Sequence, residues 1–182
     1  MATAIMLKIF TASRVTIYFD MDGCLAVWAK ATKEELEAPG FFLTRDRQMN
    51  LINACRMLIS FGFDVHILTA VMDGSIPRSE KLMWLEFAGI DRRRCIFVPY
   101  GEKKEDYILN KEGCVNILVD DYSKNLHQWT GSGNYGIKFR NGVNGSHGTW
   151  QGASIYHWMP SWLLFAAISF LAAAEAVAKA GR

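Results

Sequence analysis

The chain has 182 residues, of which 51% are hydrophobic and 21% charged, and its formal net charge is +2. This length suits one domain of ordinary size, and the apolar content supplies a full hydrophobic core, which excludes a disordered chain. The small net charge, with acids and bases interspersed, provides no basic face, so we predict no nucleic-acid partner.

The cysteines are scattered along the chain and form no CxxC pair and no zinc-type pattern with the histidines. They are Cys24, Cys55, Cys95 and Cys114. Reduced thiols of this kind are typical of a reducing compartment, so we predict a cytoplasmic protein. The N-terminal stretch MATAIMLKIFTASR has no basic leader region, and Lys8 interrupts its apolar run, which argues against a signal peptide.

The hydrophobic pattern alternates between short strands and longer helices. Strands are predicted at 15–19, 64–70, 95–99, 115–121 and 135–139. Helices are predicted at 46–61, 75–89 and 122–129, and the glycine-rich stretch NGVNGSHGTWQG is predicted to be a looping connection. Strands that alternate with helices indicate parallel βαβ units. We therefore predict a single domain over 1–182 with a three-layer, Rossmann-like α/β fold and a parallel sheet.

The segment 26–45 separates the first strand from its crossover helix and is longer than a simple loop requires. We interpret it as a small helical cap insertion over the sheet. It contains Trp28, Phe41 and Phe42, which could stack on a nucleobase. The alternative is that these aromatic side chains pack the insertion onto the sheet.

The C-terminal segment 160–180 is predicted to be an apolar, alanine-rich helix. Its apolar run begins at Trp162 and ends before Glu175, which is shorter than the roughly 20 residues that span a bilayer. We predict that this helix packs on the domain or on a partner; a membrane-seeking helix is the less favoured alternative. A homodimer through its exposed face remains an open alternative.

Polar side chains gather where the predicted strands end. Asp20 ends the first strand and Asp22 follows it; Thr69 ends the second strand. The stretch PYGEKKED follows the third strand, and Asp120 with Asp121 ends the fourth. Parallel sheets bind ligands at the carboxyl ends of their strands, so these groups should lie together.

Each of these residues also has an ordinary structural explanation, because acidic residues often cap helices and lysines are usually exposed on the surface. The combination is more specific than any part. Four carboxylates at one edge would repel one another, and a divalent cation would relieve this repulsion. Carboxylate oxygens favour Mg²⁺, which also accepts phosphate oxygens. A lysine and a hydroxyl would hold the remaining phosphate oxygens.

These stretches resemble the motifs of the haloacid dehalogenase superfamily of phosphatases. FDMDGCL resembles the first motif, ILTA the second and ILVDD the fourth, and GEKK offers the lysine of the third. The resemblance extends from about Val15 to Phe139. Within it, VPYGEKKEDYI, ILVDDYSKNLHQW and GIKFRNGVNG resemble the bacterial and phage relatives of the 5'(3')-deoxyribonucleotidases, of the 5'-nucleotidase type C family. Cys24 departs from the Thr or Val that many relatives carry there.

The resemblance implies a role for each matching residue. Asp20 would be the nucleophile that forms an aspartyl-phosphate, and Asp22 the general acid and base. Asp20, the backbone carbonyl of Asp22 and Asp121 would bind Mg²⁺, with Asp120 as a further ligand or as their partner. Thr69 and a lysine would hold the phosphoryl group, and the spacing favours Lys104 over Lys103.

The sequence thus predicts a Mg²⁺-dependent phosphomonoester hydrolase, in particular a 5'-nucleotidase acting on (deoxy)nucleoside monophosphates. Two alternatives remain. One keeps the chemistry and takes a sugar phosphate as substrate. The other is a non-catalytic phosphate- or metal-binding scaffold that associates through its C-terminal helix.

Overall fold

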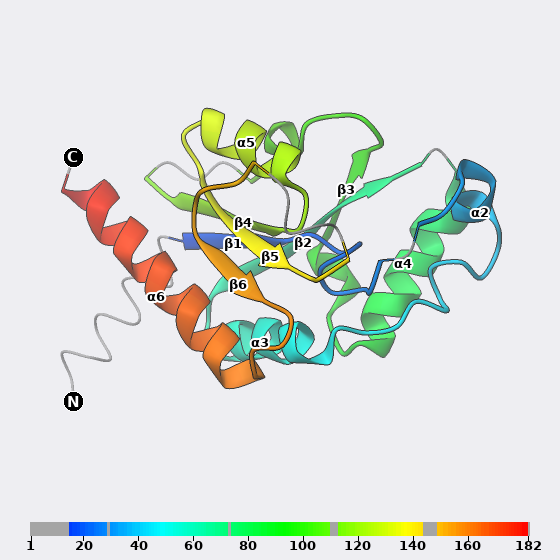
Figure 1. Cartoon of the computed structure of the whole chain (residues 1–182), viewed down its shortest axis with the longest axis horizontal. Helices are drawn as coiled ribbons and strands as arrows, with labels where there is room; N and C mark the ends of the chain where they lie inside the picture. Colours follow the sequence, from blue (N-terminus) through cyan, green and yellow to red (C-terminus); the bar gives the residue numbers. More distant parts are fainter. Residues whose placement is uncertain (1–14, 29, 73, 110–112, 144–148, 182) are drawn as a thin grey trace.

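The computed structural model describes residues 15–28, 30–72, 74–109, 113–143 and 149–181, which form a six-stranded sheet with helices on both faces (Figure 1). All neighbouring strands pair in parallel, in the order β3-β2-β1-β4-β5-β6. The strands are β1 (Val15–Phe19), β2 (Asp64–Val71), β3 (Cys95–Pro99), β4 (Val115–Asp120), β5 (Tyr135–Arg140) and β6 (Ser154–Tyr156). The predicted α/β, Rossmann-like fold with a parallel sheet is confirmed.

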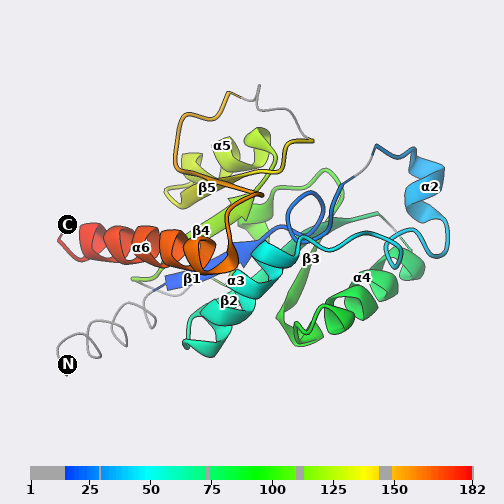
Figure 2. The ribbon, with the colours of Figure 1, turned by 60° about the horizontal axis from the view of Figure 1, so that its bottom comes forward.

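The strands are apolar throughout because helices cover both faces of the sheet. Every residue of β1 and of β4 is buried. One face carries α3 (Met49–Ser60), α4 (Ser75–Phe87) and α6 (Ser161–Ala180), and the opposite face carries α5 (Ser123–Gly131) (Figures 1 and 2). Two hydrophobic cores result, one on each side of the sheet.

The strand that the sequence did not predict is β6. It has only three residues, and it follows the glycine-rich stretch, of which 144–148 lies outside the described residues. Ile155 is its buried side chain, and its pairing with β5 places it at the edge of the sheet. A strand this short has too few residues to show an alternating pattern, so only the pairing with β5 reveals it.

In the described part of the segment 26–45, one short helix, α2 (Lys33–Glu37), is followed by turns. Thr32 and Glu35 form a capping box at its start, which explains why so short a helix forms. The insertion is attached to α4: the Glu80 carboxylate accepts a hydrogen bond from the Phe42 amide at 3.1 Å. Figure 1 shows α2 beside α4, at the end of the molecule away from α6.

The C-terminal helix α6 packs along α3 and β4. Its buried residues recur at every fourth position and are Leu164, Ile168, Ala172 and Ala176. By length and composition alone, α6 could cross a membrane. That criterion is weak for a single helix, because core helices of soluble proteins meet it as well.

Candidate functional site

The ends of β1 and β4 bring two carboxylates to one level of the sheet. Phe19 pairs with Val119, and the Asp20 amide donates to the Val119 carbonyl at 2.9 Å, so Asp20 continues the ladder at the end of β1. Asp120 is the last residue of β4 and is fully buried. The parallel register therefore places Asp20 and Asp120 on neighbouring strand ends, as the sequence predicted they should lie.

Lys104 lies between these two carboxylates. It begins the short 3₁₀ helix η2 (Lys104–Tyr107), and its Nζ donates to Asp20 Oδ1 at 2.6 Å and to Asp120 Oδ2 at 2.7 Å. Its neighbour Lys103 is exposed to solvent. Of the two lysines that the sequence offered, the structure thus directs Lys104 into the carboxylate cluster.

The charges in this cluster are strongly coupled. Burial is the largest cause that raises the pKa of Asp20, to about 7; Lys104 opposes this rise, and the Asp120 and Asp22 carboxylates add to it. Burial alone would lower the pKa of Lys104, but the Asp120 and Asp20 carboxylates outweigh burial and hold this pKa well above its usual value. Lys104 therefore stays charged, and Asp20 binds a proton more readily than an ordinary carboxylate does.

A second lysine, Lys81, holds the other acid of the first motif. Lys81 is buried in α4, and its ammonium donates to Asp22 Oδ2 and to Thr69 Oγ1, the latter at 2.8 Å. The Thr69 hydroxyl in turn donates to Asp22 Oδ2 at 3.3 Å. The structure thus joins Asp22, Thr69 and a lysine that sequence reasoning missed.

A signal for Lys81 was present in the helical pattern. The residues of α4 show helical spacing through Leu82, Leu85 and Phe87–Ala88, but Phe87 is 64% exposed. The face that is buried contains Lys81, Trp84, Leu85 and Ala88. A lysine in register with a buried apolar face is costly unless it has a buried partner, and this cost could have identified it.

Asp121 is fixed by two neighbouring segments. Its Oδ2 accepts a hydrogen bond from Asn141 Nδ2 at 2.8 Å, and the same amide donates to the Gly23 carbonyl at 2.8 Å. Lys138 donates to the backbone carbonyl of Asp121 at 2.9 Å. Neither Asn141 nor Lys138 was predicted, because each acts only through residues distant in the sequence.

Gly23 makes room for Asp121. Its φ is +89°, and a Cβ built on it would lie 2.1 Å from Asp121 Oδ2. The turn after Asp22 therefore requires glycine for two reasons: the backbone conformation and the close approach of the carboxylate.

The cluster suits a hard divalent cation. Ligand atoms of Asp20, Cys24 and Asp121 lie within 4.8 Å of one another, and all three residues are buried. Asp22 Oδ1 is buried without a hydrogen-bond partner in the described part of the chain. Lys81 pairs with Asp22, and Lys104 pairs with both Asp20 and Asp120, so two ammonium groups serve three carboxylates. Burial raises the pKa of the Cys24 thiol well above its ordinary value, and Asp121 adds to this effect, so the carboxylate oxygens are the available ligands.

A cavity of about 220 Å³ opens over the cluster. Its polar lining residues are Asp20, Asp22, Lys81, Lys104 and Asp121. The insertion contributes Trp28, Leu36 and Phe42 to the lining, as do Tyr100 and Tyr122 from other segments. Phe41 does not line it; its ring lies under the Arg45 guanidinium, 4.4 Å from the Cζ atom, and packs edge-on against Phe42.

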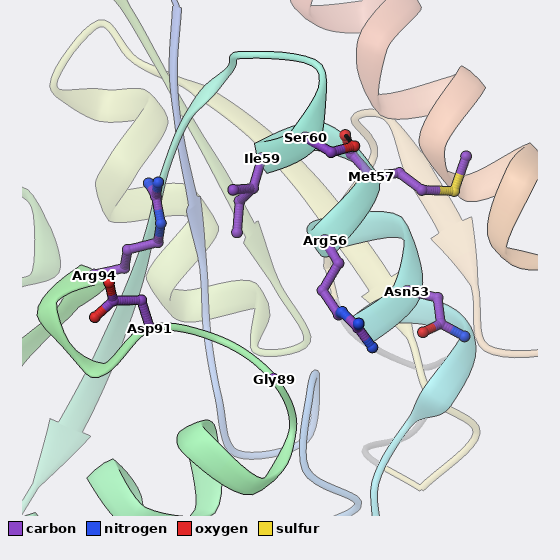
Figure 3. Close-up of a pocket in the computed structure, with 8 residues that line it drawn as sticks. All are labelled: Asn53, Arg56, Met57, Ile59, Ser60, Gly89, Asp91 and Arg94. Atoms are coloured by element: carbon purple, nitrogen blue, oxygen red, sulfur yellow. Dashed lines mark hydrogen bonds between the residues drawn. The ribbon is translucent and has the colours of Figure 1, made fainter.

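A larger cavity, of about 720 Å³, lies between α3 and the connection from α4 to β3 (Figure 3). Asn53, Arg56 and Ile59 of α3 form one side, and Asp91 and Arg94 form the other. None of the residues predicted from the strand ends lines this cavity, so it is separate from the carboxylate cluster.

No family model and no curated protein matches the chain. Among solved structures, DsGPDH of Dunaliella salina aligns with 79% of the chain at 18% identity and a TM-score of 0.46. The match covers 26% of that protein, so the chain spans about a quarter of its length. A similarity this weak identifies no family.

We predict that Gly23→Ala destabilises the protein and weakens Mg²⁺ binding, because the new methyl group displaces Asp121. The matched control is Gly133→Ala, at φ +80° with nothing within 4 Å of the added Cβ. Backbone strain alone should cost the control about 1–2 kcal/mol. Urea unfolding and calorimetric Mg²⁺ titration check this expectation. Equal losses of stability and unchanged Mg²⁺ affinity in both variants would contradict it.

We also predict that Asp20→Asn changes the pH dependence of stability in the metal-free protein. The pKa of Asp20 is about 7 in the folded chain against 3.8 ordinarily. The folded state therefore binds more protons between these values, and stability falls as pH rises through this window.

Asparagine cannot ionise, so Asp20→Asn should gain stability over the wild type at pH 8 relative to pH 4, by more than about 1.4 kcal/mol. Urea unfolding in EDTA at both pH values measures this difference. A variant that tracks the wild type at both pH values would show that Asp20 is not perturbed.

Proposed function

We propose that the protein is a Mg²⁺-dependent phosphatase that hydrolyses small phosphomonoesters through an aspartyl-phosphate, in particular a 5'-nucleotidase acting on (deoxy)nucleoside monophosphates. The observation that carries this proposal is one cluster in which Asp20 and Asp22 meet Thr69, Lys81 and Lys104 beneath a small cavity. The resemblance of these segments to the haloacid dehalogenase motifs supports it.

Asp20 is suited to act as the nucleophile. Lys104 contacts only its Oδ1, so Oδ2 can attack phosphorus while the lysine fixes the carboxylate. In the first step an Asp20 oxygen bonds to phosphorus and the bond from phosphorus to the leaving oxygen breaks. Positioning and charge neutralisation supply most of the catalysis in such a transfer.

Asp22 is suited to move the proton. In its acid form it donates a proton to the leaving alkoxide, and it then takes one from the water that attacks the phosphoenzyme and releases Asp20. In the structure, Lys81 and Thr69 donate hydrogen bonds to Asp22 Oδ2. A bound phosphate dianion competes for both donors, which frees Asp22 to carry the proton.

Mg²⁺ would be held by the Asp20 carboxylate, the Asp22 backbone carbonyl and the Asp121 carboxylate. Asp120 fits a supporting role, because its Oδ1 accepts from the Tyr122 amide and its Oδ2 from Lys104 and Asn125. When bound, the ion neutralises charge on the phosphoryl oxygens.

The cavity favours a monomeric substrate with a planar group. It is small, and its lining joins the carboxylates to aromatic side chains: Trp28 and Phe42 from the insertion, with Tyr100 and Tyr122. A nucleobase stacks on such rings. A sugar phosphate would use the same polar groups and leave the rings without a partner.

We predict metal-dependent phosphate release from a panel of nucleoside monophosphates and sugar phosphates. Asp20→Asn and Asp22→Asn should each lower the rate by at least about 1000-fold, because each removes a reacting group. Asp106→Asn, at an exposed acid of η2, should stay within about twofold. EDTA should abolish release, and added Mg²⁺ should restore it.

Equal rates of phosphate release by the wild type and by Asp20→Asn would contradict the proposal. Mg²⁺ and phosphate binding without turnover of any substrate would favour the non-catalytic scaffold instead. A preference for sugar phosphates would keep the chemistry and change the substrate class.

The adjacent lysines give a second prediction. Lys104→Met should reduce kcat/KM by at least about 100-fold, because it removes the cation beside Asp20. Lys103→Met should have little effect, because Lys103 is exposed. Lys104→Arg keeps the charge and controls for folding, with urea unfolding as the check. Equal activity of the two methionine variants would exclude the role of Lys104.

A further inference from the structure

The outward face of α6 is apolar along its whole length. Trp162, Phe170 and Val177 are 64%, 73% and 61% exposed. Exposed alanines stand between and beside them, at Ala166, Ala174 and Ala178. Figures 1 and 2 show α6 at one end of the molecule, with α3 and the sheet on one side of it only.

The charged residues of α6 are directed toward the domain. Lys179 Nζ donates to the Cys114 carbonyl at 2.6 Å. Glu175 is half-buried and close enough to Tyr135 of β5 to raise the pKa of that phenol, after the larger effect of burial. Glu175 and Lys179 are the charged residues of this helix. A surface helix normally turns its charges to solvent and its apolar residues inward.

We infer that a second copy of this chain covers this face, with the two α6 helices antiparallel about a two-fold axis near Phe170. A large contiguous apolar surface marks an interaction site. This inference rests on α6 alone and is independent of the proposed phosphatase activity.

The sequence of the face is complementary to itself in that arrangement. A two-fold axis at Phe170 sets Phe170 against its own counterpart and Ala166 against Ala174. Trp162 then meets Ala178, so a large side chain packs over a small one. Residue i facing residue j in both directions is the requirement of an isologous interface.

The exposed area is sufficient for a reversible dimer. The three large side chains and the alanines beside them would bury roughly 500 Å² per copy, or about 1,000 Å² for the pair. That is the lower end for a specific interface. The dimer should therefore dissociate on dilution.

A lipid surface fits this face less well. Interfacial helices carry cationic side chains beside the apolar face, whereas Lys179 is bound to the domain. Insertion across a bilayer would also require Leu164 and Ile168 to leave the core, where both are fully buried.

Sedimentation of the full chain over a wide concentration range tests the inference. The wild type should show a monomer–dimer equilibrium, and Phe170→Glu should raise the dissociation constant at least about 30-fold, the effect of a central interface residue. Phe87→Glu is the matched control, because Phe87 is 64% exposed on α4. It should leave the equilibrium unchanged.

Cysteine substitution tests the register. Phe170→Cys should form an intermolecular disulfide on oxidation, whereas Val177→Cys, away from the axis, should not. A wild type that is monomeric at every concentration would overturn the inference. Binding of the monomer to anionic vesicles, lost in Phe170→Glu, would assign the face to lipid and overturn it too. Protection of Phe170 in a monomer by another part of the same chain would have the same consequence.

Discussion

The ion pairs of Lys104 with Asp20 and Asp120 are the contacts on which the rest of the site depends. Parallel pairing of β1 with β4 forces two carboxylates to one level of the sheet, where they repel each other. The ammonium donates to both in a region with little solvent. Such a bridge is stable only while every partner is present, because removing one leaves an uncompensated buried charge. The nucleophile proposed here is therefore held in place before substrate arrives.

Helix α4 connects this cluster to the insertion through two consecutive residues. Glu80 binds the backbone of the insertion at Phe42, and Lys81 binds Asp22 and Thr69. Lys81 Nζ also lies 4.6 Å from the centre of the Phe42 ring. The wall that would contact substrate and the acid that would move the proton are thus fixed to the same helical turn. A displacement of the insertion would disturb Asp22 as well as the cavity.

The sequence predicted those features of the fold and of the candidate site that local residue patterns determine. The strand order in the chain and the groups at the strand ends follow from such patterns, so the amino-acid sequence alone was enough to place Asp20, Thr69 and Asp120 at one edge. Asn141 and β6 could not be placed in this way, because their roles arise only from contacts between distant segments. The aromatic residues of the insertion were also ambiguous, since Phe41 and Phe42 are adjacent and only Phe42 reaches the cavity.

Two helices depart from the usual surface pattern, in opposite ways. In α4, Glu80 and Lys81 turn inward, and each finds a partner within the chain. In α6, the apolar side chains of Trp162 and Phe170 turn outward and are mostly exposed to solvent. Charged side chains turned inward and apolar side chains turned outward lower stability, and proteins tolerate them mainly at functional sites. Since the inward charges of α4 organise the candidate site, the outward apolar face of α6 is best explained by a binding partner, and its self-complementary sequence makes a second copy the simplest one.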